Sequence, residues 1–297
     1  MDYIIDNAHI LKTGSIKNIS LLIENNHISS LRSSFNWYKH LRVNAANYIM
    51  TPTHVLFDAN LPFSGTFVQR KDYYLKQFIL KGCTTILTCT SVRKEKELTL
   101  QLKKIKSQML DCPVDYVIGI KVPTKLLTAS FLRKCKRERM PAIFVEVNHA
   151  AELEEVKWGW VKEALFPYNS PLIPIFSNDD KFTHSLWKEI MKTHRIPSLE
   201  DEIIADVPLN RKTLEKIGIF PKKSNLQDGG ELSYNFYSKD KETVKMKESE
   251  LFMKHESSLL MTIHKGKVIR AGKYMNYRPG YGEYVLIKTP SFYLSPT

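Results

Sequence analysis

The sequence predicts an α/β protein in which a segment of alternating strands and helices is inserted between two β-rich ends. Between residues 67 and 194, short β-branched runs alternate with segments of helical periodicity, the pattern of β-α-β units. The two ends of the chain contain strand-like runs and little helical periodicity. We therefore expect one β domain built from residues 1–50 plus 220–297, with an α/β domain at 51–219 between its two parts.

The first fifty residues read as short strands with turns: 3–11 and 20–31 are strand-like runs, with a turn inside the second, and 41–52 is a further candidate strand. These runs are rich in apolar and β-branched residues, and Gly and Asn occur where the chain must turn. Pro52 ends the third run.

The middle segment begins with a helix at 67–82. Tyr73, Tyr74, Phe78 and Ile79 lie at helical spacing, and Gly82 occupies the place of a C-terminal cap. The nearly uncharged run 83–90 then predicts a strand covered on both faces. Further strands are predicted at 114–122, 142–147 and 172–176, and further helices at 96–110, 128–139, 152–165, 182–194 and 211–218.

The β character returns toward the end of the chain. Runs 231–238, 258–272 and 284–288 are strand-like, and Gly266 allows a tight turn within the second of them.

Composition restricts the possible functions. The chain carries 44 Lys and Arg against 31 Asp and Glu, a formal net charge of +13, which leaves a basic surface for nucleic acid or an acidic partner as one alternative. No nucleic-acid-binding motif accompanies these residues, so we do not expect nucleic acid as the partner. No apolar run of about 20 residues predicts a membrane helix, and the N-terminus does not read as a signal peptide.

The cysteines support a cytoplasmic location. Cys83, Cys89, Cys112 and Cys135 show no CxxC spacing, which argues against a disulfide framework or a zinc site and predicts reduced thiols.

The segments IIDNAHILKTGSIKNISLLIENNHISSL near the N-terminus and MTIHKGKVIRAGKYMNYRPGYGEYV near the C-terminus resemble those of the cyclic amidohydrolases, the group of dihydropyrimidinase, hydantoinase, allantoinase and dihydroorotase. IIDNAHILKTGSIKNISLLIENNHISSL is similar to the family's opening strands, YIMTPTHVLFDANLP to its turn into the barrel, and KGCTTILTCT to its next strand. LNRKTLEKIGIFPKKSNLQDGGELSYNFY and MTIHKGKVIRAGKYMNYRPGYGEYV are similar to its C-terminal segments. The matching positions include Gly218, Gly266, Gly272, Arg278, Pro279, Gly280 and Gly282.

The resemblance implies a composite β-sandwich formed by both termini with a TIM-like (β/α) barrel inserted in it. Residues 51–219 are about 170 residues, fewer than the 200 or more that are usual for a complete barrel. We therefore expect a truncated or incomplete barrel.

The resemblance also implies a divalent metal, usually zinc, that activates water. The family's first two ligands form a His-x-His pair, and the corresponding positions here are Phe57 and Ala59, which cannot bind a metal. We read the nearby His54 as a structural histidine.

The remaining ligand positions have weak candidates. Lys121 corresponds to the bridging carboxylated lysine, and Glu146 with His149 to the next ligand; the alternative for each is an ordinary polar residue at a strand end or in a loop. Asp179 or Asp180 corresponds to the family's catalytic aspartate, but SNDD before a helical run is also typical of an N-cap.

We expect a non-catalytic protein that acts as a scaffold or regulatory subunit, binds no metal cofactor, and assembles with itself or another protein. The alternative is a hydrolase of cyclic amide C–N bonds with a rearranged site for zinc or another divalent metal. No other catalytic motif is present, and Trp158, Trp160 and Trp187 are interpreted as core or interface anchors.

Overall fold

The computed structural model describes residues 2–12, 14–178 and 180–292. It divides into two compact units, each assembled from segments that are far apart in the sequence. The β unit comprises the described residues of Met1–Leu56, Pro62–Thr85 and Lys222–Pro279, and the α/β unit those of Phe57–Leu61, Ile86–Pro221 and Gly280–Thr297. The predicted mixed α/β class is confirmed.

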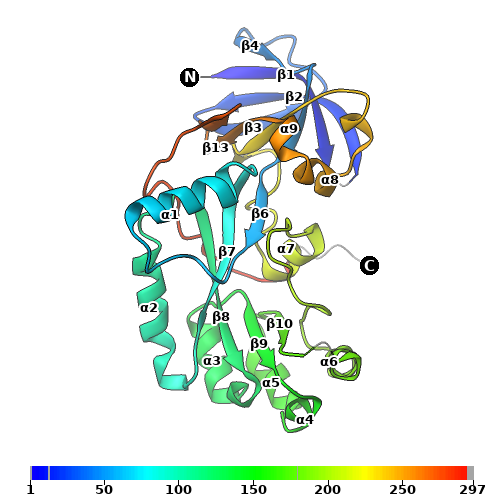
Figure 1. Ribbon diagram of the computed structural model, residues 1–297. Helices are drawn as coiled ribbons and strands as arrows, with labels where there is room; N and C mark the ends of the chain where they lie inside the picture. Colours follow the sequence, from blue (N-terminus) through cyan, green and yellow to red (C-terminus); the bar gives the residue numbers. More distant parts are fainter. Residues whose placement is uncertain (1, 13, 179, 293–297) are drawn as a thin grey trace. The chain divides into compact units, whose positions relative to one another are not determined.

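The β unit is built on a ten-stranded sheet to which both ends of the chain contribute, in blue and orange in Figure 1. Its order is β11-β3-β2-β1-β5-β12-β13-β14-β15, with β4 paired to β1. An N-terminal strand, β5, pairs antiparallel with the C-terminal strand β12. The strands are β1 (Tyr3–Lys12), β2 (Ser15–Glu24), β3 (His27–Arg32), β4 (Leu41–Asn44), β5 (Tyr48–Pro52), β11 (Gly230–Glu231), β12 (Tyr234–Ser238), β13 (Leu259–His264), β14 (Lys267–Ala271) and β15 (Tyr274–Met275).

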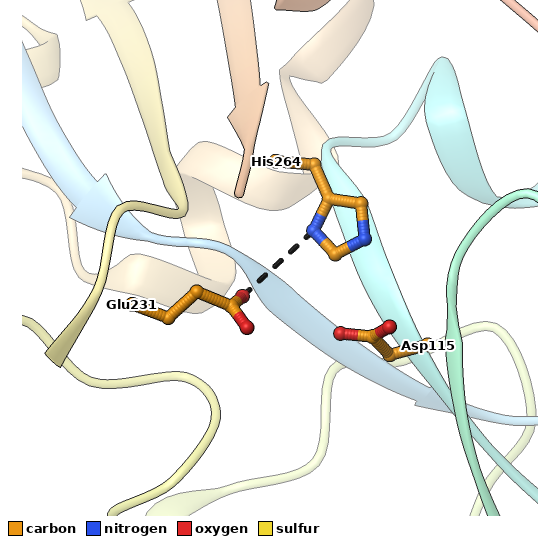
Figure 2. A group of neighbouring side chains, drawn as sticks. All are labelled: Asp115, Glu231 and His264. Atoms are coloured by element: carbon orange, nitrogen blue, oxygen red, sulfur yellow. Dashed lines mark ion pairs between the residues drawn. The ribbon is translucent and has the colours of Figure 1, made fainter. Parts of the chain in front are cut away.

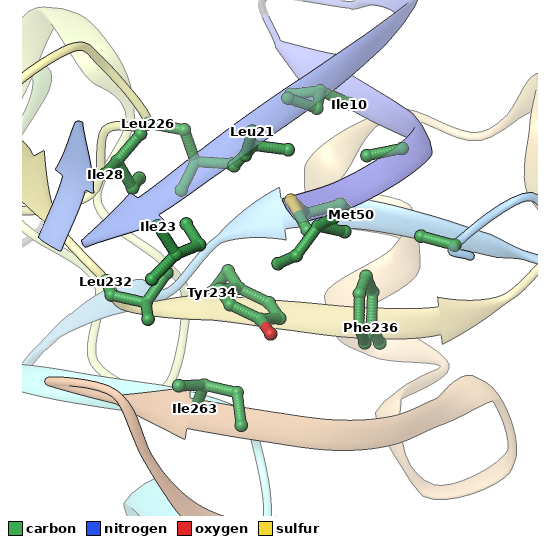
Figure 3. Packing of buried hydrophobic residues seen from close by; sticks show 13 residues of the cluster. Ile10, Leu21, Ile23, Ile28, Met50, Leu226, Leu232, Tyr234, Phe236 and Ile263 are labelled. Carbon is green, nitrogen blue, oxygen red and sulfur yellow. The ribbon is translucent and has the colours of Figure 1, made fainter. Parts of the chain in front are cut away.

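One face of this sheet carries a hydrophobic core, which Figure 3 shows from close by. Alternate residues of a strand point to the same face, and β2 accordingly contributes Leu21 and Ile23. The core also joins segments from both chain ends, because Met50 lies in it together with Phe236 and Ile263. Burial of this apolar surface stabilises the pairing of the two ends.

Short helices complete the β unit. Helix α1 (Phe67–Tyr74) continues into a π-helix (Leu75–Ile79) and ends at Gly82, whose φ of +71° is the left-handed conformation expected of a C-terminal cap. Helices α8 (Glu248–Met253) and α9 (His255–Ser258) lie in the chain between β12 and β13, a segment for which the sequence predicted no helix.

The α/β unit contains a five-stranded sheet in the order β10-β9-β8-β7-β6, and β8, β9 and β10 run parallel. The strands are β6 (His54–Phe57), β7 (Cys83–Ser91), β8 (Asp115–Pro123), β9 (Ile143–Val147) and β10 (Leu172–Phe176). The first residues of β6 and β7 belong to the β unit. The helices are α2 (Leu98–Gln108), α3 (Ala129–Arg137), α4 (Ala150–Glu154), α5 (Trp158–Leu165), α6 (Lys181–Thr193) and α7 (Arg211–Ile217).

Several predicted elements differ from the structure, and the strand expected at 41–52 is divided into β4 and β5. The helix expected at 152–165 is broken into α4 and α5, and Trp158 after the break is buried against Trp187 with ring centroids 6.3 Å apart. Residues 284–288 form no strand; Tyr284 makes only an isolated bridge to Tyr116. No helix in the described part of the chain is long and apolar enough to cross a membrane.

Candidate functional site

The carboxyl ends of β7, β8 and β9 bring together three charged side chains. Glu146, near the end of β9, accepts hydrogen bonds from both terminal nitrogens of Arg93, one of them at 3.1 Å. The ammonium of Lys121 on β8 lies 3.3 Å from Oε1 of the same carboxylate. Two cations therefore share both oxygens of Glu146. The carboxyl ends of parallel strands are where barrel enzymes place their active sites.

A thiol is adjacent to this cluster. Burial raises the pKa of Cys89 to about 12, with Lys121 opposing the rise and Asp58 and Glu146 adding to it. The thiolate is the nucleophilic form of cysteine, and burial favours the protonated thiol of Cys89 at neutral pH.

The end of β6 is apolar. Phe57, its last residue, stacks on Phe144 of β9 with ring centroids 4.7 Å apart and an interplanar angle of 19°. Ala59 lies in the bend that follows, beside Asp58, whose backbone N–H donates to the carbonyl of Leu87 at 2.9 Å. The two positions that correspond to the family's His-x-His are thus a packed ring and a methyl group.

His54 is part of the β unit. Its Nε2 lies 2.8 Å from the hydroxyl of Tyr237, and its ring meets Phe252 edge to face with centroids 5.1 Å apart. Burial, reinforced by the charge of His255, lowers the pKa of His54 to about 4. The ring is therefore neutral at physiological pH.

The other candidates lie at helix N-termini. Exposed His149 precedes α4 as its N-cap residue. Asp180 caps α6, accepting from the backbone N–H groups of Phe182 and Thr183 and from the Thr183 hydroxyl at 2.6 Å. The hydroxyl hydrogen bond of Thr183 is the main cause that lowers the pKa of Asp180. Asp179 lies outside the described residues.

A pocket of about 960 Å³ opens at the same end of the sheet. Its lining combines basic, acidic and apolar side chains from the loops after β7, β8 and β9 and from the helices that follow them. The lining residues are Arg93, Lys94, Pro123, Thr124, Lys125, Leu127, Thr128, Ala129, Asn148, Glu152, Glu155, Val156, Lys157 and Trp160. Arg93 links the pocket to the charged cluster.

One acid of the pocket is held in place by its neighbours. The carboxylate of Glu152 accepts from the hydroxyl of Thr124 at 2.8 Å and from the side-chain amide of Asn148 at 2.9 Å. Burial raises the pKa of Glu152, but these hydrogen bonds and the nearby His149 together outweigh burial, and the pKa lies below its ordinary value.

Sequence reasoning missed Arg93 and the pocket. The sequence feature that could have indicated Arg93 is its position two residues after β7, because the carboxyl end of β7 lies at the same edge of the sheet as Glu146. Trp160 had been grouped with Trp158 and Trp187 as a core or interface residue, but it is 63% exposed whereas they are buried.

A second polar cluster lies in the β unit. His264 is fully buried, and its Nδ1 lies 3.9 Å from Glu231, the ion pair drawn in Figure 2. Glu231 also binds the ammonium of Lys223 and accepts from the hydroxyl of Ser233 at 2.5 Å. Asp115 belongs to the other unit, where its carboxylate accepts from the backbone N–H of Glu283 at 2.8 Å.

The fold is shared with known hydrolase structures. No family model and no curated protein sequence matches this chain. The D-hydantoinase from Bacillus sp. AR9 is similar with a TM-score of 0.60 and 10% identity over 97% of this chain and 99% of that chain. The dihydropyrimidinase from Brevibacillus agri NCHU1002 is similar with a TM-score of 0.53 and 12% identity over 100% of both chains.

A prolidase crystallised with N-methylphosphonate-L-proline is also similar, with a TM-score of 0.52 and 5% identity over 91% of this chain and all of that chain. The resemblance to the cyclic amidohydrolases is therefore confirmed at the level of the fold. Fold alone does not determine activity, because activity depends on the side chains of the site.

Proposed function

We propose that this protein is a non-catalytic relative of the cyclic amidohydrolases that acts by binding. The observation that carries the proposal is the Arg93–Glu146–Lys121 cluster. In this interpretation an internal ion-pair network takes the place of the metal centre that the fold family implies. The ammonium nitrogen of Lys121 lies 3.3 Å from Glu146, whereas a carboxylated, metal-bridging lysine would carry negative charge at that place.

The other positions that correspond to the family's metal ligands do not fit that metal centre either. Phe57 and Ala59 offer no ligand atom, and the oxygens of Asp180 are engaged by the start of α6. Without ligands there is no metal-activated water, which is the source of the nucleophile in this family. We accordingly propose no metal cofactor for the chain.

We interpret the architecture as an incomplete (β/α) barrel, at 51–219, inserted in a composite β-sandwich of residues 1–50 plus 220–297. A five-stranded parallel sheet leaves edges that a closed barrel lacks, and bare edges favour pairing with another chain. We therefore propose self-assembly or a complex with another protein, as a scaffold or regulatory subunit. A monodisperse monomer by light scattering, with no co-purifying protein, would contradict this part.

The cysteines support a cytoplasmic location, because all four are free and buried and free thiols persist in reducing compartments. Recovery of the protein from a secreted or organellar fraction would contradict it.

The activity can be tested with hydantoin and dihydrouracil as substrates, with zinc or manganese supplied in the assay. We expect no hydrolysis above the uncatalysed rate for the wild type, and Glu146→Gln should change nothing but stability. Removing one member of a partly buried ion-pair cluster leaves its cations unpaired, and we expect a loss of about 1–2 kcal/mol in the free energy of unfolding.

The matched control is Glu154→Gln, which alters an exposed glutamate on α4. Metal-dependent hydrolysis that Glu146→Gln abolishes while the protein remains folded would overturn the proposal. It would support the rearranged-site hydrolase instead.

A further inference from the structure

The pocket beside the charged cluster is suited to a specific class of ligand. Its volume of about 960 Å³ lies within the range of small-molecule and cofactor sites. All of its lining residues belong to the α/β unit. The site is therefore complete within one unit.

Positive charge is in excess at this pocket. Arg93, Lys94, Lys125 and Lys157 line it together with two acids, Glu152 and Glu155. Arg93 is paired with Glu146, and Glu152 is held by Thr124 and Asn148. Among the described residues, none of the three lysines forms a salt bridge. The pocket consequently has ammonium groups available for an anion.

The start of a helix adds to this charge. Thr128 caps the nine-residue helix α3, and Thr128 and Ala129 both line the pocket. Backbone N–H groups and the positive end of the helix dipole favour an anion at such a place.

The pocket also has an apolar part. Leu127 and Val156 line the pocket with Trp160, whose side chain is 63% exposed although it belongs to a helix that buries Trp158. An exposed indole that lines a pocket offers a face on which a planar ring can stack. A ligand that fits both halves of the lining carries an anionic group and a flat ring.

We propose that this pocket binds a small molecule in which a phosphate group is joined to a planar ring, as in a mononucleotide. This proposal deepens the proposed function, on which it rests, by naming the ligand class of the binding site. A phosphate fits better than a carboxylate because three lysines face the pocket, and a dianion satisfies more of them than a monoanion does.

Binding can be measured by calorimetry on the full chain with four mononucleotides, AMP, GMP, CMP and UMP, as probes. We expect at least one of them to bind with a dissociation constant below about 1 mM. The corresponding nucleoside lacks the phosphate, inorganic phosphate lacks the ring, and indole-3-acetate carries one negative charge where the phosphate carries two. Each of the three should therefore bind at least about tenfold more weakly than the mononucleotide. The affinity for the mononucleotide should also fall with added salt.

Two variants test the anion-binding lysines and the stacking surface of Trp160 separately. Lys125→Gln combined with Lys157→Gln should weaken mononucleotide binding about tenfold or more but leave nucleoside binding unchanged. Trp160→Ala should weaken both mononucleotide and nucleoside. The matched controls are Lys104→Gln on the exposed side of α2 and Trp37→Ala in the β unit, where the ring is 96% exposed. Both controls should bind as the wild type does.

The proposal is overturned if none of the four mononucleotides binds, if indole-3-acetate binds as tightly as they do, or if the lysine variant binds like its control. Metal content and hydrolysis, measured on the same sample, decide the proposed function separately. A protein that holds metal and hydrolyses hydantoin refutes the proposed function, whether or not it binds nucleotides.

Discussion

Individual side chains at the carboxyl ends of the parallel strands determine the chemistry that is open to this protein. Glu146 is a carboxylate that already has two cationic partners, Arg93 and Lys121. Phe57 packs on Phe144 and has no donor atom. A hydrolytic centre needs a nucleophile or an activated water, and the thiol nearest this cluster, Cys89, is held protonated by burial.

His54 provides a pH-dependent test at the residue scale. Its pKa is about 4 in the folded protein against 6.5 for the free side chain. Between these values the unfolded chain binds more protons than the folded one, so stability falls as the pH is lowered from 6.5 to 4. The shift corresponds to about 3 kcal/mol.

We expect His54→Gln to remove this part of the pH dependence, measured by urea unfolding at several pH values. The exposed His27→Gln should retain the wild-type slope. Parallel pH profiles for wild type and His54→Gln would show that His54 is not buried in its neutral form.

At the scale of elements, the alternation of strands and helices was predictable because each strand from β7 to β10 is a short apolar run. The breaks were less predictable. The pattern at 152–165 fits one helix, yet the segment divides into α4 and α5, and Trp158 after the break is buried against Trp187. Tyr284 lies in a β-branched, strand-like run, yet it bridges to the start of β8 instead of joining a ladder.

The candidate site was predictable in part, because Lys121 and Glu146 were both candidates from the sequence and lie together in the structure. The sequence shows that Phe57 and Ala59 are not histidines, but Arg93 pairs with Glu146 across 53 positions. Such a contact depends on which strands become neighbours in the sheet, and short-range patterns contain no information about it.

Gly282 tests a contact inside the α/β unit, between its C-terminal segment and the residues that precede β8. A Cβ at this position would lie 1.8 Å from the carbonyl oxygen of Val114, so Gly282→Ala must displace backbone. We expect a loss of about 1–3 kcal/mol in the free energy of unfolding, measured by denaturant titration.

The matched control is Gly159→Ala in helix α5, where a Cβ would meet no atom within 4 Å. Alanine is a better helix former than glycine, so this variant should gain up to about 1 kcal/mol. Equal effects of the two substitutions would contradict the close approach at Gly282.

At the scale of the whole molecule, the fold is shared with hydrolase structures, whereas the role that we propose is binding without catalysis. The fold is that of hydantoinase and dihydropyrimidinase structures at 10–12% identity, yet the side chains at the strand ends form ion pairs and ring stacks. The net charge of +13 is consistent with anionic ligands or partners. The binding role that we propose is compatible with both the shared fold and the side chains at the strand ends.

Elemental analysis of protein purified without chelators tests this account most directly. We predict far less than one zinc, manganese, iron or cobalt ion per chain, and no uptake after incubation with excess zinc and desalting. The Phe57→His, Ala59→His double variant serves as a comparison, because it restores two imidazoles at the end of β6. Near-stoichiometric metal in the wild-type protein would contradict the account.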